Sequence, residues 1–217
     1  MKTILFQGDS ITEAGRYKPN PESMGNGYAC MAAGVVEYEH PGQYRCLNRG
    51  IGGNRIADLY ARIREDLINL KPDIVSILIG VNDIWSDVAD DMGSSPEKFE
   101  RVYRWIVQEI QETLPQTKIL LLGPYVLEGK GTCNNEEFPH RWEFMRDGVA
   151  ELDKRTEQIA KDLAVAYVPT QGAFDEALTK APVDYWVIEG VHPTPAGYEV
   201  IKRQWLKGFA MLEGDMK

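Results

Sequence analysis

The sequence predicts a three-layer α/β/α sandwich built on a five-stranded parallel sheet, and two observations carry that prediction. Short apolar runs alternate along the chain with longer segments whose apolar residues recur at helical spacing. Residues 74–79, Ile-Val-Ser-Ile-Leu-Ile, are almost continuously apolar, which is typical of a central strand covered on both faces. Strands that alternate with helices form parallel sheets wrapped on both sides. A chain of 217 residues suits one buried core, so we expect a single domain over residues 1–217.

Each predicted element follows from its local pattern. Strands are expected where short apolar runs precede turn-forming residues, at 4–6, 44–48, 74–79, 118–122 and 165–168. Helices are expected at 28–38, 56–70, 96–114, 142–163 and 196–212, with a short helical piece around 174–178. Ser95 and Pro96 form a typical helix start, because proline fits the first helical position. The acidic stretch before them, which holds Asp87 and Asp91, predicts a loop.

Composition narrows the classes of partner. The formal net charge is −9 and the pI is near 4.9, which argues against a nucleic-acid partner or an anionic membrane surface. No basic region followed by an apolar core opens the chain and no run approaches a membrane span, so we expect a cytoplasmic protein. Cys30, Cys46 and Cys133 show no metal-ligand or disulfide spacing, so we expect no metal. The sequence leaves a homo-oligomer open.

The segment Gly8-Asp9-Ser10 ends the first apolar run. In an open α/β sheet, the carboxyl edge of the strands is where ligands bind. A serine at this edge is a candidate nucleophile if a base and an oxyanion-binding site reach it from other segments. The alternative is structural, because Ser10-Ile11-Thr12-Glu13 also fits a capping box in which Ser10 caps a helical turn.

The candidate base is His192. The other two histidines, His40 and His140, lie beside prolines in polar loops, where we expect them to be solvated. Glu189 precedes His192 by three residues, and a tight loop can bring its carboxylate to the Nδ1 hydrogen of the imidazole. The other ring nitrogen is then free to take a proton from a serine. The alternative is a loop histidine that precedes a helix started by Thr194.

Two further loops follow predicted strands and open on the same edge of the sheet. The first contains Gly52-Gly53 and the second is Gly80-Val81-Asn82-Asp83. The backbone N–H of Gly53, the carboxamide of Asn82 and the Ser10 N–H are candidate donors to a developing oxyanion. The alternatives are a turn that requires glycine and an Asx turn.

Together these segments resemble the SGNH hydrolase superfamily, also called GDSL lipases/acylhydrolases. Its four sequence blocks are matched in order by residues 8–10, Gly53, residues 80–83 and residues 189–193. The resemblance implies a flavodoxin-like parallel sheet with no metal or organic cofactor. It also implies that Ser10 is the nucleophile and His192 the general base. Gly53 and Asn82 would donate to the oxyanion together with the Ser10 amide, and Asp9 would brace the nucleophile loop.

Longer stretches are similar to a subgroup, the bacterial carbohydrate acetylesterases, and above all to intracellular acetylxylan esterases. These stretches are residues 48–59, 79–85 and 124–129. The resemblance implies a serine esterase that removes acetyl groups from a small acetylated carbohydrate such as a xylo-oligosaccharide. The chain departs from the family at Glu189, where the family has aspartate. If the longer Glu189 side chain does not reach the imidazole, a backbone carbonyl or Asp184 is the alternative.

Aromatic residues near these blocks are candidates to flank a sugar, because aromatic faces suit pyranose rings. They are Trp85, Tyr125, Tyr185 and Trp186, and ordinary packing is the alternative for each. Within the same superfamily, the alternative activities are those of a lysophospholipase, a short-chain lipase or a thioesterase. A dinucleotide-binding protein fits poorly, because Arg55 stands where the third glycine of its motif belongs. A non-catalytic carbohydrate-binding protein is a more distant alternative.

Overall fold

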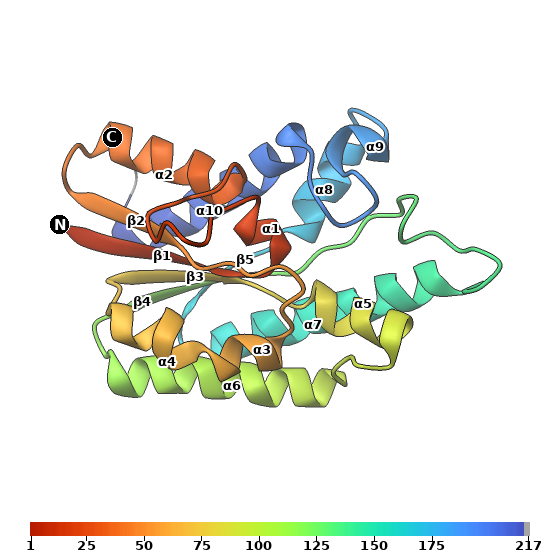
Figure 1. Ribbon diagram of the computed structural model, residues 1–217, viewed down its shortest axis with the longest axis horizontal. Helices are drawn as coiled ribbons and strands as arrows, with labels where there is room; N and C mark the ends of the chain where they lie inside the picture. Colours follow the sequence, from red (N-terminus) through yellow and green to blue (C-terminus); the bar gives the residue numbers. More distant parts are fainter. Residues whose placement is uncertain (215–217) are drawn as a thin grey trace.

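A parallel five-stranded sheet forms the centre of the molecule in the computed structural model, which describes residues 1–214, with side chains at all of these except 89 and 90 (Figure 1). The strand order is β2-β1-β3-β4-β5. The strands are β1 (Lys2–Gly8), β2 (Tyr44–Asn48), β3 (Ile74–Leu78), β4 (Lys118–Leu122) and β5 (Ala166–Val168). All neighbouring pairs are parallel. The predicted α/β fold class is confirmed.

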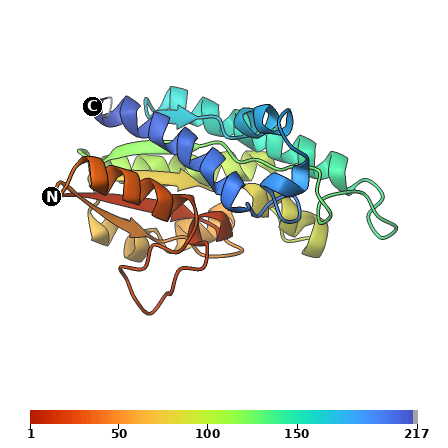
Figure 2. The same ribbon diagram turned by 90° about the horizontal axis from the view of Figure 1, so that it is seen from above.

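Helices cover both faces of the sheet, as Figures 1 and 2 show. One face carries α2 (Tyr28–Glu39), α8 (Gln171–Leu178) and α10 (Pro195–Glu213). The other carries α3 (Ile56–Ala61), α6 (Pro96–Thr113) and α7 (Arg141–Asp162). The shorter helices are α1 (Ser10–Glu13), α4 (Ile63–Asp66), η1 (Ile68–Leu70), α5 (Val81–Asp90) and α9 (Val183–Trp186).

Aromatic side chains join β1 to the helices above it. The Phe6 ring stacks on Trp205 of α10 with 4.8 Å between centroids. It packs edge-to-face with Tyr28 of α2, with 6.0 Å between centroids. All three side chains are fully buried. Large buried rings of this kind dominate core stability, so β1 is anchored on this face close to the point where its chain turns toward Ser10.

Residues 56–70 do not form the single helix that their apolar spacing predicts. The chain is divided into α3, α4 and η1, with turns at Arg62 (φ −107°, ψ 10°) and Leu67 (φ −140°, ψ −66°). Ile63 and Ile68 still reach the core, so the apolar pattern is satisfied by a bent path. The Arg62 side chain points back to the loop before α3, and its hydrogen bonds there oppose a straight helix.

The prediction of a loop before Ser95 is also wrong, because most of that segment forms helix α5. Val81, Ile84, Trp85 and Val88 recur at helical spacing, and Ile84 packs against Gly148 of α7. A Cβ atom at Gly148 would lie 2.9 Å from the Ile84 side chain, so the two helices approach closely. Contact with α7 therefore outweighs the polar character of the acidic residues on the other side of α5.

Hydroxyl groups cap the starts of two long helices, and the start at Ser95 confirms a prediction. The Ser95 hydroxyl accepts a hydrogen bond from Lys98 N at the start of α6, and the Thr194 hydroxyl accepts one from Gly197 N at the start of α10. None of the helices within residues 1–214 is both long and apolar enough to cross a membrane. The single domain over 1–217 stays a prediction, and residues 215–217 lie outside the described part.

Candidate active site

Ser10 is the first residue of α1 and is separated from the end of β1 by Asp9 alone. A Cβ atom at Gly8 would collide with the Leu78 carbonyl oxygen and the Thr12 side chain, so this turn requires glycine. The cap of α1 is Asp9, whose Oδ1 accepts a hydrogen bond from Ile11 N at 2.9 Å. The capping-box interpretation of Ser10 is therefore wrong. Asp9 performs the capping, and the Ser10 hydroxyl is available for other contacts.

The Ser10 hydroxyl meets His192, which is 182 residues later in the chain. Ser10 Oγ lies 2.7 Å from His192 Nε2. On the other side of the imidazole, Nδ1 is hydrogen-bonded to Glu189 Oε1, which also accepts the His192 backbone N–H at 3.0 Å. Glu189 thus reaches the ring despite its extra methylene. Within residues 1–214, Asp184 makes no hydrogen bond to His192 and lies exposed on α9.

The loop that carries this pair is pinned on both sides. Ile188 N donates to the His192 carbonyl at 2.8 Å, and Thr194 N donates to the Trp186 carbonyl at 2.9 Å. Opposite, Gly131 N donates to the Glu189 carbonyl at 2.7 Å. A Cβ atom at Gly131 would lie 3.0 Å from Glu189 Cγ. The segment before α7 therefore leaves room for the longer acidic side chain because it has glycine at this position.

The electrostatics favour an imidazole that gains a proton readily. The hydrogen bond that the imidazole donates to Glu189 raises the pKa of His192 above its usual value, against the opposing effect of burial. Burial acts to raise the pKa of Glu189, but its hydrogen bonds with His192 outweigh that effect and lower it. Glu189 is therefore a carboxylate at neutral pH and stabilises a positive charge on the ring.

Asp9 lies beneath the site and is almost completely buried. Its Oδ2 has no hydrogen-bond partner among the described residues. Burial raises the pKa of Asp9 to about 7, while the Ile11 amide and the nearby His192 act to lower it. The side chain braces the first turn of α1, which agrees with the supporting role that the resemblance implies.

The loop that carries Gly53 passes beside Ser10, and Asn82 is hydrogen-bonded to the same loop. Gly53 has a left-handed φ of +77°, and its amide has no hydrogen-bond acceptor within residues 1–214. A Cβ atom added at neighbouring Gly52 would lie 3.6 Å from Ser10 Cβ, which places this loop beside the serine. Asn82 lies in the first turn of α5, and its Nδ2 donates to the Asn54 carbonyl at 3.0 Å. That bond uses one of its two hydrogens, and the other has no acceptor among the described residues.

The sequence reasoning missed two residues that order this edge. The Glu13 carboxylate accepts the Gly52 N–H and pairs with Lys18 at 3.1 Å, instead of completing a capping box. Buried Asn48 donates to the Thr12 carbonyl at 2.6 Å and accepts Gly50 N at 2.9 Å. Asn48 had a signal, since a polar residue directly follows the apolar pair Cys46-Leu47 at the end of a strand. Glu13 had none, because its partner is 39 residues away.

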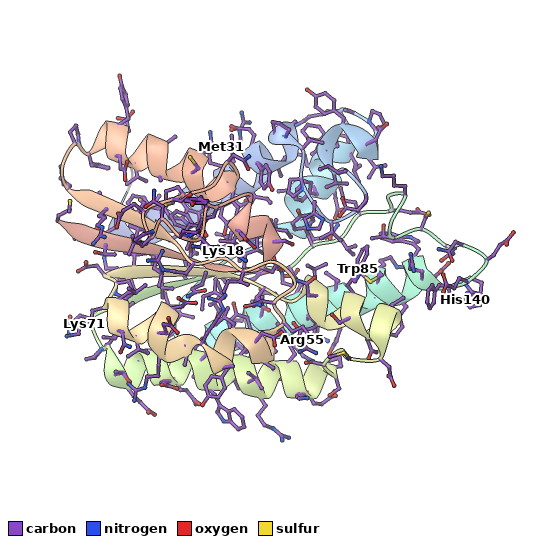
Figure 3. All side chains as sticks on the ribbon, in the orientation of Figure 1. Lys18, Met31, Arg55, Lys71, Trp85 and His140 are labelled. Atoms are coloured by element: carbon purple, nitrogen blue, oxygen red, sulfur yellow. The ribbon has the colours of Figure 1, made fainter. Side chains whose placement is uncertain are left out.

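The four aromatic candidates fall in different places. Tyr125 is fully buried, and its hydroxyl donates to the Val191 carbonyl at 2.7 Å. The prediction that this ring contacts a sugar is therefore wrong. The buried ring instead supports the loop that carries His192. Trp85 is half-buried on α5 (Figure 3). Contact with substrate stays a prediction for Trp85, Tyr185 and Trp186.

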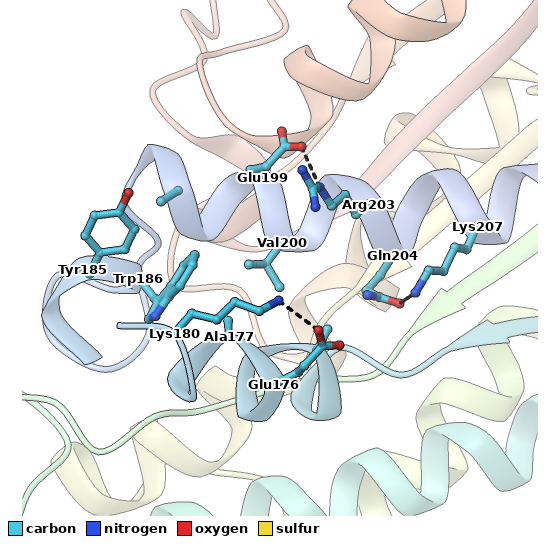
Figure 4. Close-up of a pocket in the computed structure, with 12 residues that line it drawn as sticks. Glu176, Ala177, Lys180, Tyr185, Trp186, Glu199, Val200, Arg203, Gln204 and Lys207 are labelled. Atoms are coloured by element: carbon cyan, nitrogen blue, oxygen red, sulfur yellow. Dashed lines mark hydrogen bonds and ion pairs between the residues drawn. The ribbon is translucent and has the colours of Figure 1, made fainter. Parts of the chain in front are cut away.

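Tyr185 and Trp186 line a hollow of about 500 Å³ between α8, α9 and α10 (Figure 4). An ion pair lies along each of two walls, Lys180 with Glu176 and Arg203 with Glu199, each at 2.9 Å. Ser10, Glu189 and His192 are not among its lining residues. The hollow is therefore separate from the serine, although α9 leads directly into the His192 loop.

No group of three or more His, Cys, Asp or Glu side chains in the described part of the chain is placed to hold a metal ion. His40 caps the end of α2, and exposed His140 lies at the outer end of the segment before α7 (Figure 3). His192 is therefore the one histidine of the three that the structure brings to Ser10.

A hydroxyl, an imidazole and a carboxylate hydrogen-bonded in series at the carboxyl edge of a parallel sheet are the arrangement that serine hydrolases use. The family model described as the GDSL-like lipase/acylhydrolase family matches residues 6–200. The chain belongs to this family.

Relatives that match nearly the whole chain support this family assignment. An acetylxylan esterase from Geobacillus stearothermophilus is 36% identical over 216 residues, which cover 94% of this chain and 92% of that protein. Its solved structure matches with a TM-score of 0.83 and 32% identity, covering 95% of this chain and 93% of that one. A solved structure described as a GDSL-like lipase from Parabacteroides merdae has a TM-score of 0.88 and 30% identity, covering 97% and 96%. The protein is a carboxylic ester hydrolase.

Proposed function

We propose that this enzyme removes acetyl groups from small acetylated carbohydrates of the xylo-oligosaccharide type. The observation that carries the proposal is the hydrogen-bonded series Ser10–His192–Glu189, with the Gly52-Gly53 loop next to Ser10. The name of the Geobacillus relative, an acetylxylan esterase, supports the choice of substrate. A cytoplasmic location is part of the proposal and is tested by cell fractionation. The oligomeric state stays open between a monomer and a homo-oligomer, which size-exclusion chromatography distinguishes.

The first half-reaction transfers the acetyl group to the enzyme. Ser10 Oγ attacks the acetyl carbonyl carbon while His192 Nε2 takes the hydroxyl proton, and Glu189 stabilises the imidazolium. The negative charge develops on the carbonyl oxygen, where the amides of Ser10 and Gly53 and the free Asn82 hydrogen donate to it. His192 then gives its proton to the sugar oxygen as the carbon–oxygen bond breaks.

The second half-reaction restores the serine. A water molecule gives a proton to His192 and attacks the acetyl-enzyme at the same carbonyl carbon. The imidazolium returns that proton to Ser10 Oγ, and acetate leaves. Solved variants of the Geobacillus esterase described as catalytic mutants replace a serine, an aspartate and a histidine, which supports the proposed roles of Ser10, Glu189 and His192.

The primary test compares wild type with Ser10→Ala in the hydrolysis of 4-nitrophenyl acetate. We expect kcat to fall at least ~10³-fold, because the covalent step is lost while the fold is kept. Tyr17→Ala is a matched control, since the Tyr17 side chain is exposed and lies outside the proposed machinery. Equal rates for wild type and Ser10→Ala would contradict the nucleophile assignment.

The substrate class needs a separate experiment. We expect kcat/KM to decrease from acetyl to octanoyl esters of 4-nitrophenol, and acetylated xylo-oligosaccharides to release acetate. A preference for long acyl chains would instead favour the lysophospholipase or lipase alternative, and rapid cleavage of acyl thioesters would favour a thioesterase. Binding of acetylated oligosaccharide without release of acetate would favour the non-catalytic alternative.

A further inference from the structure

The three proposed oxyanion donors lie on three separate segments of the chain. The Arg62 side chain is hydrogen-bonded to the segments of Ser10 and Gly53, and Asn54 links it to Asn82. We propose that Arg62 is a positioning residue that sets the distances between the donors on Ser10, Gly53 and Asn82. This inference rests on the proposed function, since it concerns the transition state of the ester hydrolysis described above. Arg62 itself does not contact the reacting atoms.

Arg62 lies at the junction of α3 and α4, and its side chain is 13% exposed. Nη2 donates to the Gly8 carbonyl at 3.1 Å and Nη1 donates to the Arg49 carbonyl at 2.8 Å. Nε donates to Asn54 Oδ1 at 2.7 Å. One planar group thus spans the end of β1 and both sides of the loop that contains Gly53.

Two of these contacts, with Gly8 and Asn54, lie within two residues of a proposed donor. Gly8 is two residues before Ser10, and its carbonyl also accepts the Ile51 N–H at 3.1 Å. Asn54 directly follows Gly53, so the bond that holds the Asn54 side chain also orients the Gly53 N–H. The Asn54 carbonyl accepts Asn82 Nδ2 at 3.0 Å. A shift of Asn54 would therefore move the Gly53 and Asn82 donors together.

The charge on Arg62 is compensated within the same cluster. Burial acts to lower the pKa of Arg62, while the Asp66 carboxylate, 2.9 Å from Nη1, acts to raise it. A guanidinium stays protonated under such conditions and presents donors in a fixed fork. A lysine has a single nitrogen on a flexible stem, so it cannot span Gly8, Arg49 and Asn54 at once.

Another buried arginine shows that the arrangement is particular to Arg62. The Arg16 guanidinium has a single hydrogen bond among the described residues, from Nη2 to the Gly50 carbonyl at 3.0 Å, and its Nε has no partner. Arg155 makes three ion pairs, two with α6 (Glu97 and Glu100) and one within α7 (Glu151), and none of these partners belongs to the proposed site. Arg155 is therefore a matched control for the loss of a well-bonded arginine.

The experiment uses the full chain and compares wild type, Arg62→Ala, Arg62→Lys and Arg155→Ala in 4-nitrophenyl acetate hydrolysis. The concentration of active sites is counted by fluorophosphonate labelling. For Arg62→Ala we expect kcat to fall roughly 10- to 100-fold with little change in KM, because misplaced donors weaken transition-state binding alone. The acidic limb of the pH profile stays in place, since His192 and Glu189 are untouched. Arg62→Lys loses nearly as much.

Affinity for phenylboronic acid supplies a second measurement, because its tetrahedral adduct with Ser10 mimics the transition state. We expect Arg62→Ala to weaken this affinity by about the same factor as kcat. Arg155→Ala lowers the melting temperature and leaves kcat and boronate affinity unchanged. If Arg62→Ala does not fold, Asn54→Ala removes one link and is expected to show the same parallel losses, of about 10-fold.

The outcomes separate the two proposals. If wild type shows no Ser10-dependent hydrolysis, the proposed function fails and the role of Arg62 in catalysis fails with it. If wild type is active and Arg62→Ala has wild-type kcat per active site, the inference about Arg62 alone is overturned. A fall in kcat with unchanged boronate affinity would also overturn it, because the oxyanion site would then be intact.

Discussion

At the scale of single residues, the imidazole of His192 is held by Glu189 on one side and faces Ser10 on the other. Glu189 has two functions in the geometry, since the same oxygen accepts the ring N–H and the backbone N–H of His192. The backbone bond fixes where the carboxylate lies, and the ring bond fixes the tautomer that presents Nε2 to the serine.

This arrangement predicts the effect of Glu189→Gln on pH dependence. The Glu189 hydrogen bond raises the pKa of His192, so its loss lowers that pKa. A general base must be neutral, so the acidic limb of the kcat/KM profile moves to lower pH in the variant. We also expect kcat at pH 8 to fall on the order of 10²-fold, because the imidazolium loses its counter-charge.

Stopped-flow or steady-state rates from pH 5 to 9 measure this effect. Asp184→Asn is the control, because Asp184 is exposed and makes no hydrogen bond to His192 among the described residues. An unchanged profile and kcat in Glu189→Gln would remove Glu189 from the mechanism. A loss in Asp184→Asn instead would transfer the role to that residue.

At the scale of elements, the segment between β4 and α7 forms the outer wall of the acid-bearing loop. Its backbone bonds run from Leu127 N to the Gly190 carbonyl at 2.9 Å and from Gly131 N to the Glu189 carbonyl at 2.7 Å. These bonds hold the loop from the side opposite to α9. A long irregular segment is thereby ordered at the point where the site needs it.

Gly131→Ala tests whether this wall positions Glu189. The added methyl group would lie 3.0 Å from Glu189 Cγ and 3.1 Å from its Cβ, so the acidic side chain must move by a few tenths of an ångström. We expect kcat to fall roughly 10-fold, because catalysis is sensitive to small displacements of oriented groups. Kinetics with 4-nitrophenyl acetate measure the effect.

Gly34→Ala in α2 is the matched control. A Cβ atom there meets nothing within 4 Å, and the residue is helical. We expect wild-type kcat and a gain of about 0.5–1 kcal/mol in the free energy of unfolding. A Gly131→Ala enzyme with wild-type kcat would show that Glu189 is positioned by its own loop alone.

At the scale of the whole molecule, two buried carboxyl groups link folding to pH. Burial raises the pKa of Asp9 and of Asp83 from 3.8 to about 7 in each case. Asp83 Oδ2 accepts Ile56 N at 3.0 Å, so Asp83 joins α5 to α3 as Asp9 joins β1 to α1. Both groups bind protons more tightly in the folded than in the unfolded state.

The sign of the effect follows from this proton uptake. Below about pH 4 both states are protonated, and between that pH and about 7 the folded state alone keeps its protons, so stability falls as pH rises. Each group accounts for up to about 4 kcal/mol between pH 4 and pH 8. We expect Asp9→Asn and Asp83→Asn each to flatten the pH dependence of the free energy of unfolding.

Urea titrations at pH 5, 6, 7 and 8 measure that dependence. Asp175→Asn is the control, because the Asp175 side chain is exposed on α8. Parallel curves for wild type and the Asp9 and Asp83 variants would contradict the assignment of raised pKa values to these two groups.

Much of the candidate site could be predicted because its parts are local. Ser10, Gly53 and Asn82 each follow a strand in a short block, and parallel strands end at one edge whatever the loops do. Glu189 and His192 are close in sequence, so their contact needs one tight loop. Helix α5 was missed because its stability comes from Ile84 against α7, a contact between segments about 60 residues apart.

The amino-acid sequence by itself determined the α/β class, the positions of the five strands along the chain and the residue types at the site. These depend on periodicity and on motifs within a few residues, which a linear pattern records. The tertiary structure alone decided that Asp9 and not Ser10 caps α1, that Gly131 leaves room for Glu189, and that Arg62 is bonded to Gly8, Arg49 and Asn54. Such contacts join residues that only folding brings together, because a hydrogen bond is specified by position in space and not by separation along the chain.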